Sequence, residues 1–443
     1  MLESFDKNKL IIFSCVVALV VGLIGFFIYK GLSKPPPEKM TLQFWGTFDD
    51  GSYYEDAIKG FKATNPNVNI VFRQLPYGEY HDALVKAFAA NAGPDIFMIH
   101  NTWLPQNYNY VQPMPDSIPD YNKPDEQFTF KKFQEIFTDV AVNDLTVDQT
   151  VFGVPLYIDT LALYYNKDLF NTAGITTPPK TWEEFVKDIP LLTKKNSQGN
   201  ITQSAAAIGT AKNINRSIDV LSLLMLQSGA RMTNDANTSA TFAEPISGFQ
   251  AGQQALEFYT DFANPAKTDR YTWNDQLDYS IDAFANGKTA MMFNYSHHLA
   301  TLHEKSLRLN FGVAMMPQPV DAKIRVDYAN YWGLVVAKQS KHPVEAWKFL
   351  THLTTTDAII PYINISQRPP ARKDLIDKLR NNPEFGVFAP QALTARSWYQ
   401  VETATIESLF AKMIDDVNFN RATIRAALDE AQNKVNVLMK KAK

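Results

Sequence analysis

The chain has very little cysteine: Cys15 is the only one among 443 residues. Its absence from residues 40–443 excludes disulfides, thiolate nucleophiles and cysteine-ligated metals in that part. No G-x-S-x-G, H-E-x-x-H or G-x-G-x-x-G motif occurs, and there is no internal repeat. The net charge is −3, so the chain lacks the cationic excess of a general binder of phosphate backbones. We therefore expect no nucleic-acid partner and no cofactor.

Three patterns imitate catalytic or metal sites. Asn286–Thr289 resembles the end of a Walker A loop, but Asp282 stands where the first glycine is required, so a turn before a strand is favoured. His297–His298 with His303 suggests a metal site, yet adjacent helical side chains diverge by about 100° and no cysteine or ordered carboxylate joins them. Asp49–Asp50 are loop neighbours, which rarely face one glycosidic bond from both sides. None of these patterns requires an enzyme, although none excludes one.

The N-terminal region carries the longest uncharged run. Leu10–Tyr29 is twenty residues without a charge, which as a helix spans about 30 Å, the thickness of a bilayer core. We expect a retained membrane anchor preceded by a cytoplasmic tip, residues 1–9. A cleaved signal peptide is the alternative, with Gly31–Ser33 as a weak cleavage site, but such apolar regions are usually about 7–15 residues long. Lipidation of Cys15 is disfavoured because few apolar residues precede it and Phe13 is bulky.

A proline-rich linker follows at residues 30–39, in which Lys34–Lys39 predicts a short, extended polyproline spacer. From Met40 onwards the chain is long enough for two domains of ordinary size. The C-terminal segment Ile424–Leu438 carries a continuous apolar stripe at helical spacing, which we expect to pack on one of these domains. A coiled coil is the alternative, although the stripe covers only about two heptads.

Strands and helices alternate after the linker. Thr41–Trp45 and Val68–Phe72 have strand character, and Tyr54–Phe61 between them has helical spacing. A second helix over Tyr80–Ala92 ends at a Gly-Pro pair and leads to the strand Asp95–Ile99. Two such βαβ units predict a doubly wound lobe with parallel strands. In such sheets ligands bind at the carboxyl ends of the strands.

The segment Val151–Phe185 is the most specific in the chain. It predicts a strand at Leu161–Tyr165, a brief helix at Asp168–Thr172, a turn, and a helix opened by Thr181 with Glu184 completing a capping box. Its G-V-P, Y-N-K-D-L-F and P-P-x-T-W-E-E-F elements resemble, in order, the family-1 extracytoplasmic solute-binding proteins of ABC importers, the maltose-binding-protein-like group. Later segments resemble the same family, and these are Ala283–Asn294, Phe311–Pro319 and Gln367–Arg372.

The resemblance implies an α/β, two-lobed periplasmic-binding-protein-like fold of type II with doubly wound mixed sheets, joined to the N-terminal transmembrane helix. The implied lobes are discontinuous, with residues 40–156 and 319–366 in lobe 1 and residues 160–316 and 368–443 in lobe 2. The chain is expected to cross between them near Pro155–Asp159, Pro317–Pro319 and Ser366–Pro370. Several crossings form a hinge, and a hinge permits closure over a ligand.

Aromatic and short polar side chains gather where strands end. Sugars present apolar faces rimmed with hydroxyls, so their sites combine aromatic platforms with short polar groups. The candidate residues are Trp45, Thr47, Asp49, Asn101, Trp103, Tyr157, Asp159, Asn294, Tyr295, His297, Trp332 and Trp398. The resemblance carries over seven of them by local match, namely Trp45, Thr47, Asp49, Asn101, Trp103, Asn294 and Trp398. His297 stands where the family's sugar binders often have a stacking Trp, which argues against strict maltodextrin specificity.

The resemblance implies a monomeric, extracytoplasmic substrate-binding subunit of an ABC importer, which the uncharged run Leu10–Tyr29 would anchor in the membrane. It would bind a sugar or oligosaccharide between the lobes and deliver it to membrane permease subunits. Asp49 and Asn101 are expected to bind hydroxyls, and Trp45, Trp103 and Trp398 to stack on the sugar ring. The alternatives are an anchored enzyme that acts on glycans and a sensor module on the same fold.

Overall fold

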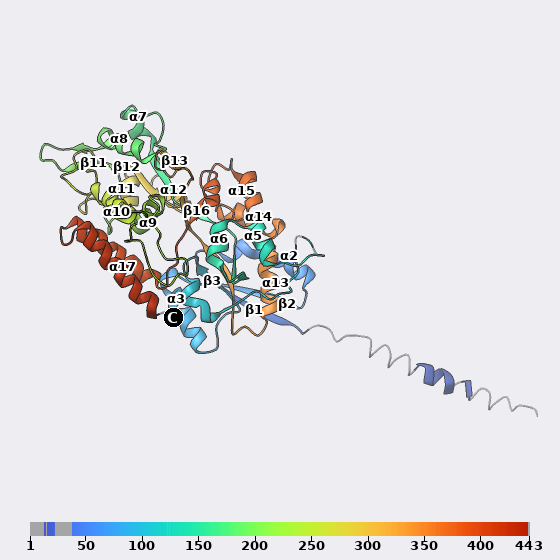
Figure 1. Cartoon of the computed structure of the whole chain (residues 1–443). Helices are drawn as coiled ribbons and strands as arrows, with labels where there is room; N and C mark the ends of the chain where they lie inside the picture. Colours follow the sequence, from blue (N-terminus) through green and yellow to red (C-terminus); the bar gives the residue numbers. More distant parts are fainter. Residues whose placement is uncertain (1–12, 15, 23–37, 122, 124, 442–443) are drawn as a thin grey trace, which may run out of the picture.

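The computed structural model describes residues 13–14, 16–22, 38–121, 123 and 125–441. Of the expected anchor Leu10–Tyr29, residues 13–14 and 16–22 are described and are helical, whereas its other residues, Cys15 included, and most of the linker lie outside the described ranges. Within the described ranges, no helix combines the length and the apolar character needed to cross a membrane. The remainder forms two α/β bodies, each built on its own sheet (Figure 1).

The first sheet is mixed, with β1 parallel to both β2 and β3, while β15 runs antiparallel to its neighbours. Its strands, in spatial order, are β2 (Val68–Gln74), β1 (Met40–Gly46), β3 (Ile96–His100), β15 (Trp332–Ala337) and β4 (Val111–Gln112), with β7 (Gly153–Pro155) also on β15. The parallel pair β1–β2 confirms the predicted βαβ unit. The small hairpin of β5 (Thr146–Val147) and β6 (Thr150–Val151) adjoins this body.

The helices of the first body are η1 (Gly51–Tyr54), α2 (Glu55–Thr64), α3 (Tyr77–Ala89), α4 (Leu104–Asn107), η2 (Tyr108–Tyr110), α5 (Phe130–Ile136), α6 (Asp139–Leu145), α13 (Pro343–Leu353), α14 (Thr356–Ser366), α15 (Lys373–Leu379) and η3 (Ala389–Leu393). Trp347 of α13 and Phe61 of α2 are fully buried in the core beneath them. Burying a large apolar side chain contributes about 1.5–3 kcal/mol, so such residues fix these helices on the sheet.

The second sheet is also mixed, because β11 and β12 are parallel and the other pairs antiparallel. Its strands, in spatial order, are β10 (Lys194–Lys195), β11 (Ile201–Ala206), β12 (Thr289–Asn294), β9 (Ala162–Asn166) and β13 (Phe311–Met315). Its helices are α7 (Lys167–Thr172), α8 (Trp182–Leu192), α9 (Ser217–Gln227), α10 (Ala251–Asp261), α11 (Ser280–Ala285), α12 (His298–Lys305), α16 (Thr403–Asn418) and α17 (Ile424–Lys441).

Two local predictions in the second body are confirmed. Thr181 and Glu184 form a complete capping box at the start of α8, with the Glu184 backbone N–H donating to the Thr181 hydroxyl at 3.1 Å. The Walker-like Asn286–Thr289 is the turn from α11 into β12, with Gly287 at φ 68°. The C-terminal helix α17 packs on α10 and α16 and buries Leu428 and Val435 completely.

A third, three-stranded sheet joins the two bodies. Its strands are β16 (Ala395–Arg396), β14 (Asp327–Asn330) and β8 (Asp159–Thr160). Each strand lies on a different passage of the chain between the two larger sheets, and β16 lies between them in Figure 1. Backbone hydrogen bonds also place Pro369–Ala371 beside the first crossing, from Ile158 N to Pro369 O at 3.0 Å and from Ala371 N to Leu156 O at 3.2 Å.

The third passage lies later in the chain than the expected Ser366–Pro370. After that turn, α15 packs against α5 and η3, and its Leu375 and Ile376 are buried in the core of the first body. The chain reaches α16 of the second body only after β16. The chain stays with the first body through α15 because the apolar face of this helix packs against α5 and η3. The lobe limits expected from the sequence stay a prediction.

Candidate functional site

A cavity of about 660 Å³ lies between the two bodies, beside the first crossing. We call it the aromatic cleft. It is lined by Phe48, Tyr77, Gly78, His81, His100, Trp103, Gln106, Tyr157, Asp159, Arg216, His297, Asn330, Trp332, Arg368, Glu402, Thr403, Ala404, Thr405 and Glu407. These residues come from the carboxyl ends of β1, β3, β12 and β14, the start of β15, the first crossing, the turn after α14, helix α4, and the N-terminal turns of α3, α9 and α16. Strand and helix ends thus converge on one volume, as expected for such sheets.

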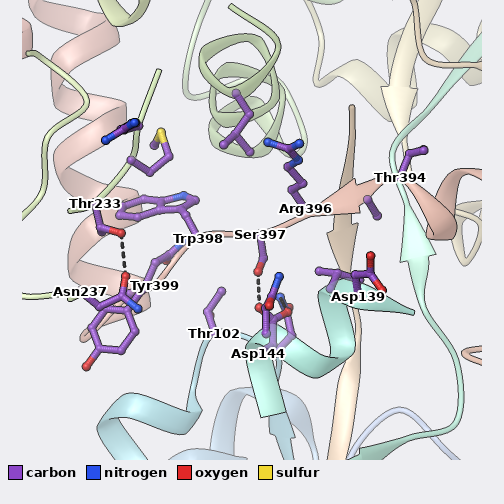
Figure 2. Close-up of a pocket in the computed structure, with 18 of the residues that line it drawn as sticks. Thr102, Asp139, Asp144, Thr233, Asn237, Thr394, Arg396, Ser397, Trp398 and Tyr399 are labelled. Carbon is purple, nitrogen blue, oxygen red and sulfur yellow. Dashed lines mark hydrogen bonds between the residues drawn. The ribbon is translucent and has the colours of Figure 1, made fainter. Parts of the chain in front are cut away.

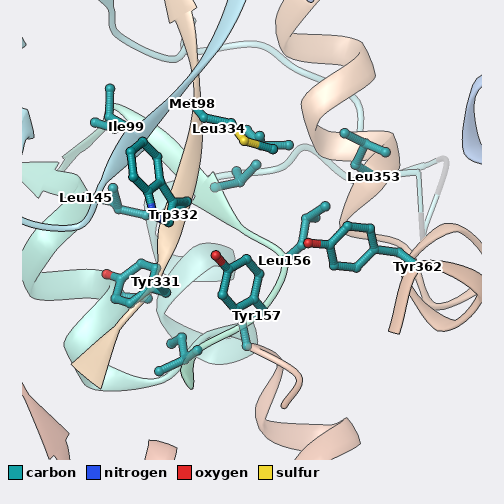
Figure 3. Packing of buried hydrophobic residues seen from close by; sticks show 14 of the residues in the cluster. Met98, Ile99, Leu145, Leu156, Tyr157, Tyr331, Trp332, Leu334, Leu353 and Tyr362 are labelled. Carbon is teal, nitrogen blue, oxygen red and sulfur yellow. The ribbon is translucent and has the colours of Figure 1, made fainter. Parts of the chain in front are cut away.

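The first body contributes an aromatic wall, defined as Phe48, Tyr77, His100, Trp103 and Trp332. Trp332 is at its centre, because the antiparallel register places it opposite His100 and its ring centroid lies 5.0 Å from Trp103 and 5.6 Å from Phe48. Figure 3 shows the Trp332 ring packed among residues of the buried core, including Ile99 and Leu145. The core therefore holds the wall rigidly from behind.

Phe48 has a strained backbone. Its φ is 65°, which is unusual for a bulky residue and costs free energy unless the surroundings enforce it. The ring stacks on Tyr77 with centroids 5.1 Å apart, yet half of the side chain stays exposed. Strain that presents an aromatic ring to an open cavity is typical of a binding surface.

Arg368 enters the cleft from the turn after α14. Its guanidinium donates to Asp49 Oδ1 at 2.6 Å and to the Tyr362 hydroxyl at 3.0 Å, and it lies over the Tyr157 ring at 4.4 Å. Burial opposes the charge of Arg368, but Tyr157, Tyr362 and Asp49 raise its pKa well above the ordinary value. Asp49 itself is fully buried behind the wall. The pair holds Tyr157 at the edge of the cleft.

Arg216 enters from the opposite side, at the start of α9. It donates from Nε to Asp219 Oδ2 at 2.7 Å, and its guanidinium lies 5.4 Å from the Tyr295 ring centroid. The Tyr295 hydroxyl donates to the same Asp219 oxygen at 2.6 Å. Burial opposes the charge of Arg216, but Asp219 and then Tyr295 raise its pKa. Its backbone has φ 62°, a left-handed conformation rare for residues other than Gly, Asn and Asp.

Asp159 ties the first crossing to the loop after β12. It accepts hydrogen bonds from the Ser296 backbone N–H at 3.0 Å and from the Ser296 hydroxyl at 2.8 Å. His297 Nδ1 lies 3.3 Å from Asp159 Oδ2, the oxygen that accepts from the Ser296 hydroxyl. The His297 ring stacks on Tyr295 with the ring centroids 5.8 Å apart. The hinge segment and the second body therefore meet at one buried carboxylate.

The start of α16 closes the cleft on the second body's side. The Thr403 and Thr102 hydroxyl oxygens lie 2.7 Å apart, which is a direct contact between the two bodies. Glu402 and Glu407 project from the same end of the helix into the cleft lining. Burial raises the pKa of the Glu407 carboxyl, against the opposing effect of Arg216. Burial and the Arg216 charge lower the pKa of His100 to about 4, so His100 is neutral near pH 7.

A second cavity, of about 770 Å³, is lined by Thr102, whose contact partner Thr403 lines the aromatic cleft. We call it the Asp144 cavity. Asp144 Oδ2 accepts from Asn101 Nδ2 and from the Tyr331 hydroxyl, both at 2.9 Å, and the Ser397 hydroxyl donates to Oδ1. Figure 2 shows Ser397 above Asp144, with Trp398, Thr233 and Asn237 around the cavity. Burial raises the pKa of Asp144 to about 6.

In the structure, the twelve candidate residues expected from the sequence fall into three groups by location. Five of them line the aromatic cleft: Trp103, Tyr157, Asp159, His297 and Trp332. Two line the Asp144 cavity: Asn101 and Trp398. The other five lie in or behind the walls: Trp45, Thr47, Asp49, Asn294 and Tyr295. Of these, Thr47, Asp49, Asn294 and Tyr295 are almost fully buried, and Trp45 lies under Arg73 at 4.9 Å. Ligand contact by any of the twelve stays a prediction.

Several cleft residues escaped the sequence analysis. Arg216 follows no motif, and its role depends on a left-handed backbone that the sequence does not show. Arg368 lies in a turn that the sequence did single out, but its partner Asp49 is 319 residues away. Glu407 lies on α16, where only helical spacing identifies the face that it shares with Thr403. Phe48 lies between the candidates Thr47 and Asp49, but the sequence does not show that its side chain is half-exposed.

Comparisons with known proteins agree with this geometry. A sequence profile of the family described as bacterial extracellular solute-binding protein matches residues 45–360. The multiple sugar-binding protein of Streptococcus mutans is 26% identical over 376 residues, which cover 83% of each chain. The sn-glycerol-3-phosphate-binding periplasmic protein UgpB of Shigella dysenteriae is 25% identical over 300 residues, 64% of this chain and 62% of that protein.

A solved structure shows the same fold. The sugar-binding protein MalE from Xanthomonas citri superposes with a TM-score of 0.72 at 21% identity, covering 91% of this chain and 98% of that one. Because the family profile matches residues 45–360, well over half of the chain, the chain belongs to the bacterial extracellular solute-binding proteins.

Proposed function

We propose that this protein binds a sugar or oligosaccharide in the aromatic cleft and delivers it to the permease of an ABC importer. The observation that carries the proposal is the aromatic wall around Trp332, which faces polar groups of the second body across a cavity of about 660 Å³. This volume lies within the range of about 300–1,000 Å³ usual for small-molecule sites. Aromatic faces match the apolar faces of sugar rings, and the polar side chains match their hydroxyls.

The cleft is assembled from both bodies, which supports binding by closure. Trp103 comes from the first body, His297 from the second, and Tyr157 from the crossing between them. A solute that contacts all three binds the closed arrangement more tightly than an open one, and this differential affinity shifts the population towards closure. The closed form is the state that a permease would recognise.

Similar proteins support the proposal that the ligand is a sugar. The Streptococcus mutans relative is a multiple sugar-binding protein, and the Xanthomonas citri structure is a sugar-binding protein. We propose that Leu10–Tyr29 tethers the protein as a monomer to the membrane, with the two bodies on the extracytoplasmic side. The uncharged run of twenty residues supports the tether.

Titration calorimetry of the full chain in detergent micelles tests the proposal. The ligand panel contains mono- and oligosaccharides, amino acids, short peptides and polyol phosphates. We expect saturable heat from one or more sugars and none from the amino acids or peptides. Binding of amino acids or peptides with no heat from any sugar would contradict the sugar assignment and leave the fold intact.

A further inference from the structure

The aromatic cleft contains more negative than positive charge. Its lining carries two arginines, Arg216 and Arg368, and three carboxylates, Asp159, Glu402 and Glu407. Two more carboxylates, Asp49 and Asp219, lie directly behind the lining. His100 is neutral near pH 7, because burial lowers its pKa to about 4. The carboxylates therefore outnumber the arginines.

Both arginines are already paired with carboxylates. Arg368 is ion-paired with Asp49 at 2.6 Å, and Arg216 is hydrogen-bonded to Asp219 from both Nε and Nη2. These carboxylates are almost fully buried, so their charges are poorly screened by solvent. A phosphate group in the cleft would meet guanidinium groups already neutralised by carboxylates and the further negative charges of Asp159, Glu402 and Glu407, and binding would be unfavourable.

Glu407 is close enough to interact electrostatically with the aromatic wall on one side and with Arg216 on the other. Burial, and next the negative charge of Glu407, raise the pKa of the Tyr77 hydroxyl in the aromatic wall. On the other side, the same charge helps to raise the pKa of Arg216. Among the described residues, no hydrogen bond or ion pair engages the Glu407 carboxylate, although the side chain is half-buried. When a ligand fills the cleft and displaces water from this carboxylate, a donor or a cation on the ligand would compensate the loss.

We propose that the cleft selects a sugar carrying a protonated amino group, with the ammonium between Glu407 and the aromatic wall, and that it discriminates against phosphorylated sugars. This inference rests on the proposed sugar-binding function. An ammonium is attracted by the π faces of Trp and Tyr as well as by a carboxylate. A neutral sugar would use only the aromatic surface and the hydrogen-bonding groups.

Calorimetry of the full chain with matched sugars tests the inference. Oligomers of β-1,4-linked glucosamine are compared with the N-acetylated oligomers, with the corresponding glucose oligomers, and with glucose 6-phosphate and sn-glycerol 3-phosphate. We expect the amino sugar to bind at least about tenfold more tightly than either neutral oligomer, and no heat from the phosphates. Glu407→Gln should remove most of this preference, and Glu430→Gln on α17, away from the cleft, should leave the preference unchanged.

Four results would overturn the inference or the role given to Glu407. Equal affinity for amino and neutral sugars would overturn it alone and leave the proposed function standing, as would tighter binding of a phosphorylated ligand than of its neutral counterpart. A preference for amino sugars that survives in Glu407→Gln would overturn the role of that carboxylate. Absence of binding to every sugar would overturn both this inference and the proposed function.

Discussion

Arg368 donates to Asp49 at 2.6 Å across 319 residues of sequence. The same carboxylate accepts hydrogen bonds from Tyr54 at 2.5 Å and Tyr362 at 3.0 Å, and it is fully buried. Because Arg368 also lies over Tyr157 on the first crossing, this pair connects the loop after β1 with the hinge. The position of the cleft's edge therefore depends on one buried ion pair.

Replacing the carboxylate of this pair should destabilise the fold. We expect Asp49→Asn to lower the free energy of unfolding by about 3–5 kcal/mol, because the buried Arg368 charge loses its partner. Urea denaturation followed by circular dichroism measures the change. Asp377→Asn is the control, since its ion pair with Arg380 is exposed and is worth about 0–1 kcal/mol. A similar decrease in the free energy of unfolding in both variants would show that burial does not make the Asp49–Arg368 pair more important for stability than the exposed pair.

Trp103 should contribute directly to sugar affinity. Its ring packs edge-on against Trp332 and lines the cleft, so Trp103→Ala removes part of the aromatic wall. We expect affinity for the sugar found by calorimetry to fall about tenfold or more, equivalent to about 1.4 kcal/mol. Tyr110→Ala is the control, because this half-exposed ring stacks on Phe88 and does not line the cleft. Unchanged affinity in Trp103→Ala would place the sugar elsewhere.

Asp144 should make stability depend on pH. Burial raises its pKa from the ordinary 3.8 to about 6, so the folded state holds this proton more tightly than the unfolded chain. Its stabilising contribution is therefore complete below about pH 4 and is lost as the pH rises through 6. The loss is at most about 3 kcal/mol.

Asp144→Asn isolates this contribution, because the amide does not titrate. Denaturation midpoints measured between pH 4 and 6.5 should fall with rising pH more steeply in the natural chain than in the variant. Other raised carboxyls, such as Asp188, act equally on both proteins and cancel in the comparison. Parallel curves would show that Asp144 is not protonated in the folded state.

Two helical glycines should respond oppositely to the same substitution. In α10, a Cβ on Gly252 would come within 2.0 Å of the Phe242 backbone oxygen, so Gly252→Ala should destabilise the protein by about 2 kcal/mol or more. In α2, a Cβ on Gly60 would meet only the His352 ring at 3.4 Å, so Gly60→Ala should stabilise by about 0.5–1 kcal/mol. Thermal denaturation distinguishes the two, and equal shifts would contradict the close approach at Gly252.

Much of the fold could be predicted from local patterns. The alternation in β1 and β2 and the helical spacing between them predicted the parallel pair, and Thr181 with Glu184 predicted the start of α8. These features depend on residues within one or two turns of each other. The third passage at β16 could not be predicted in this way, because it depends on which core buries Leu375 and Ile376.

The candidate site was less predictable than the fold. Trp103, Tyr157 and Trp332 were chosen because aromatic residues followed strand ends, and they line the cleft. Asp49 was chosen by the same reasoning, but it is buried as the partner of Arg368. The sequence shows that a polar residue follows a strand, but not whether its side chain faces the cavity or the core.

By itself, the sequence determined the strand and helix types, the family and the aromatic character of the loops, because periodicity, capping and turn residues act over short distances. The tertiary structure alone decided which residues share the cleft, which carboxylates neutralise Arg216 and Arg368, and where the third passage lies. Those outcomes depend on contacts between segments up to hundreds of residues apart, and the packing of the two cores sets them.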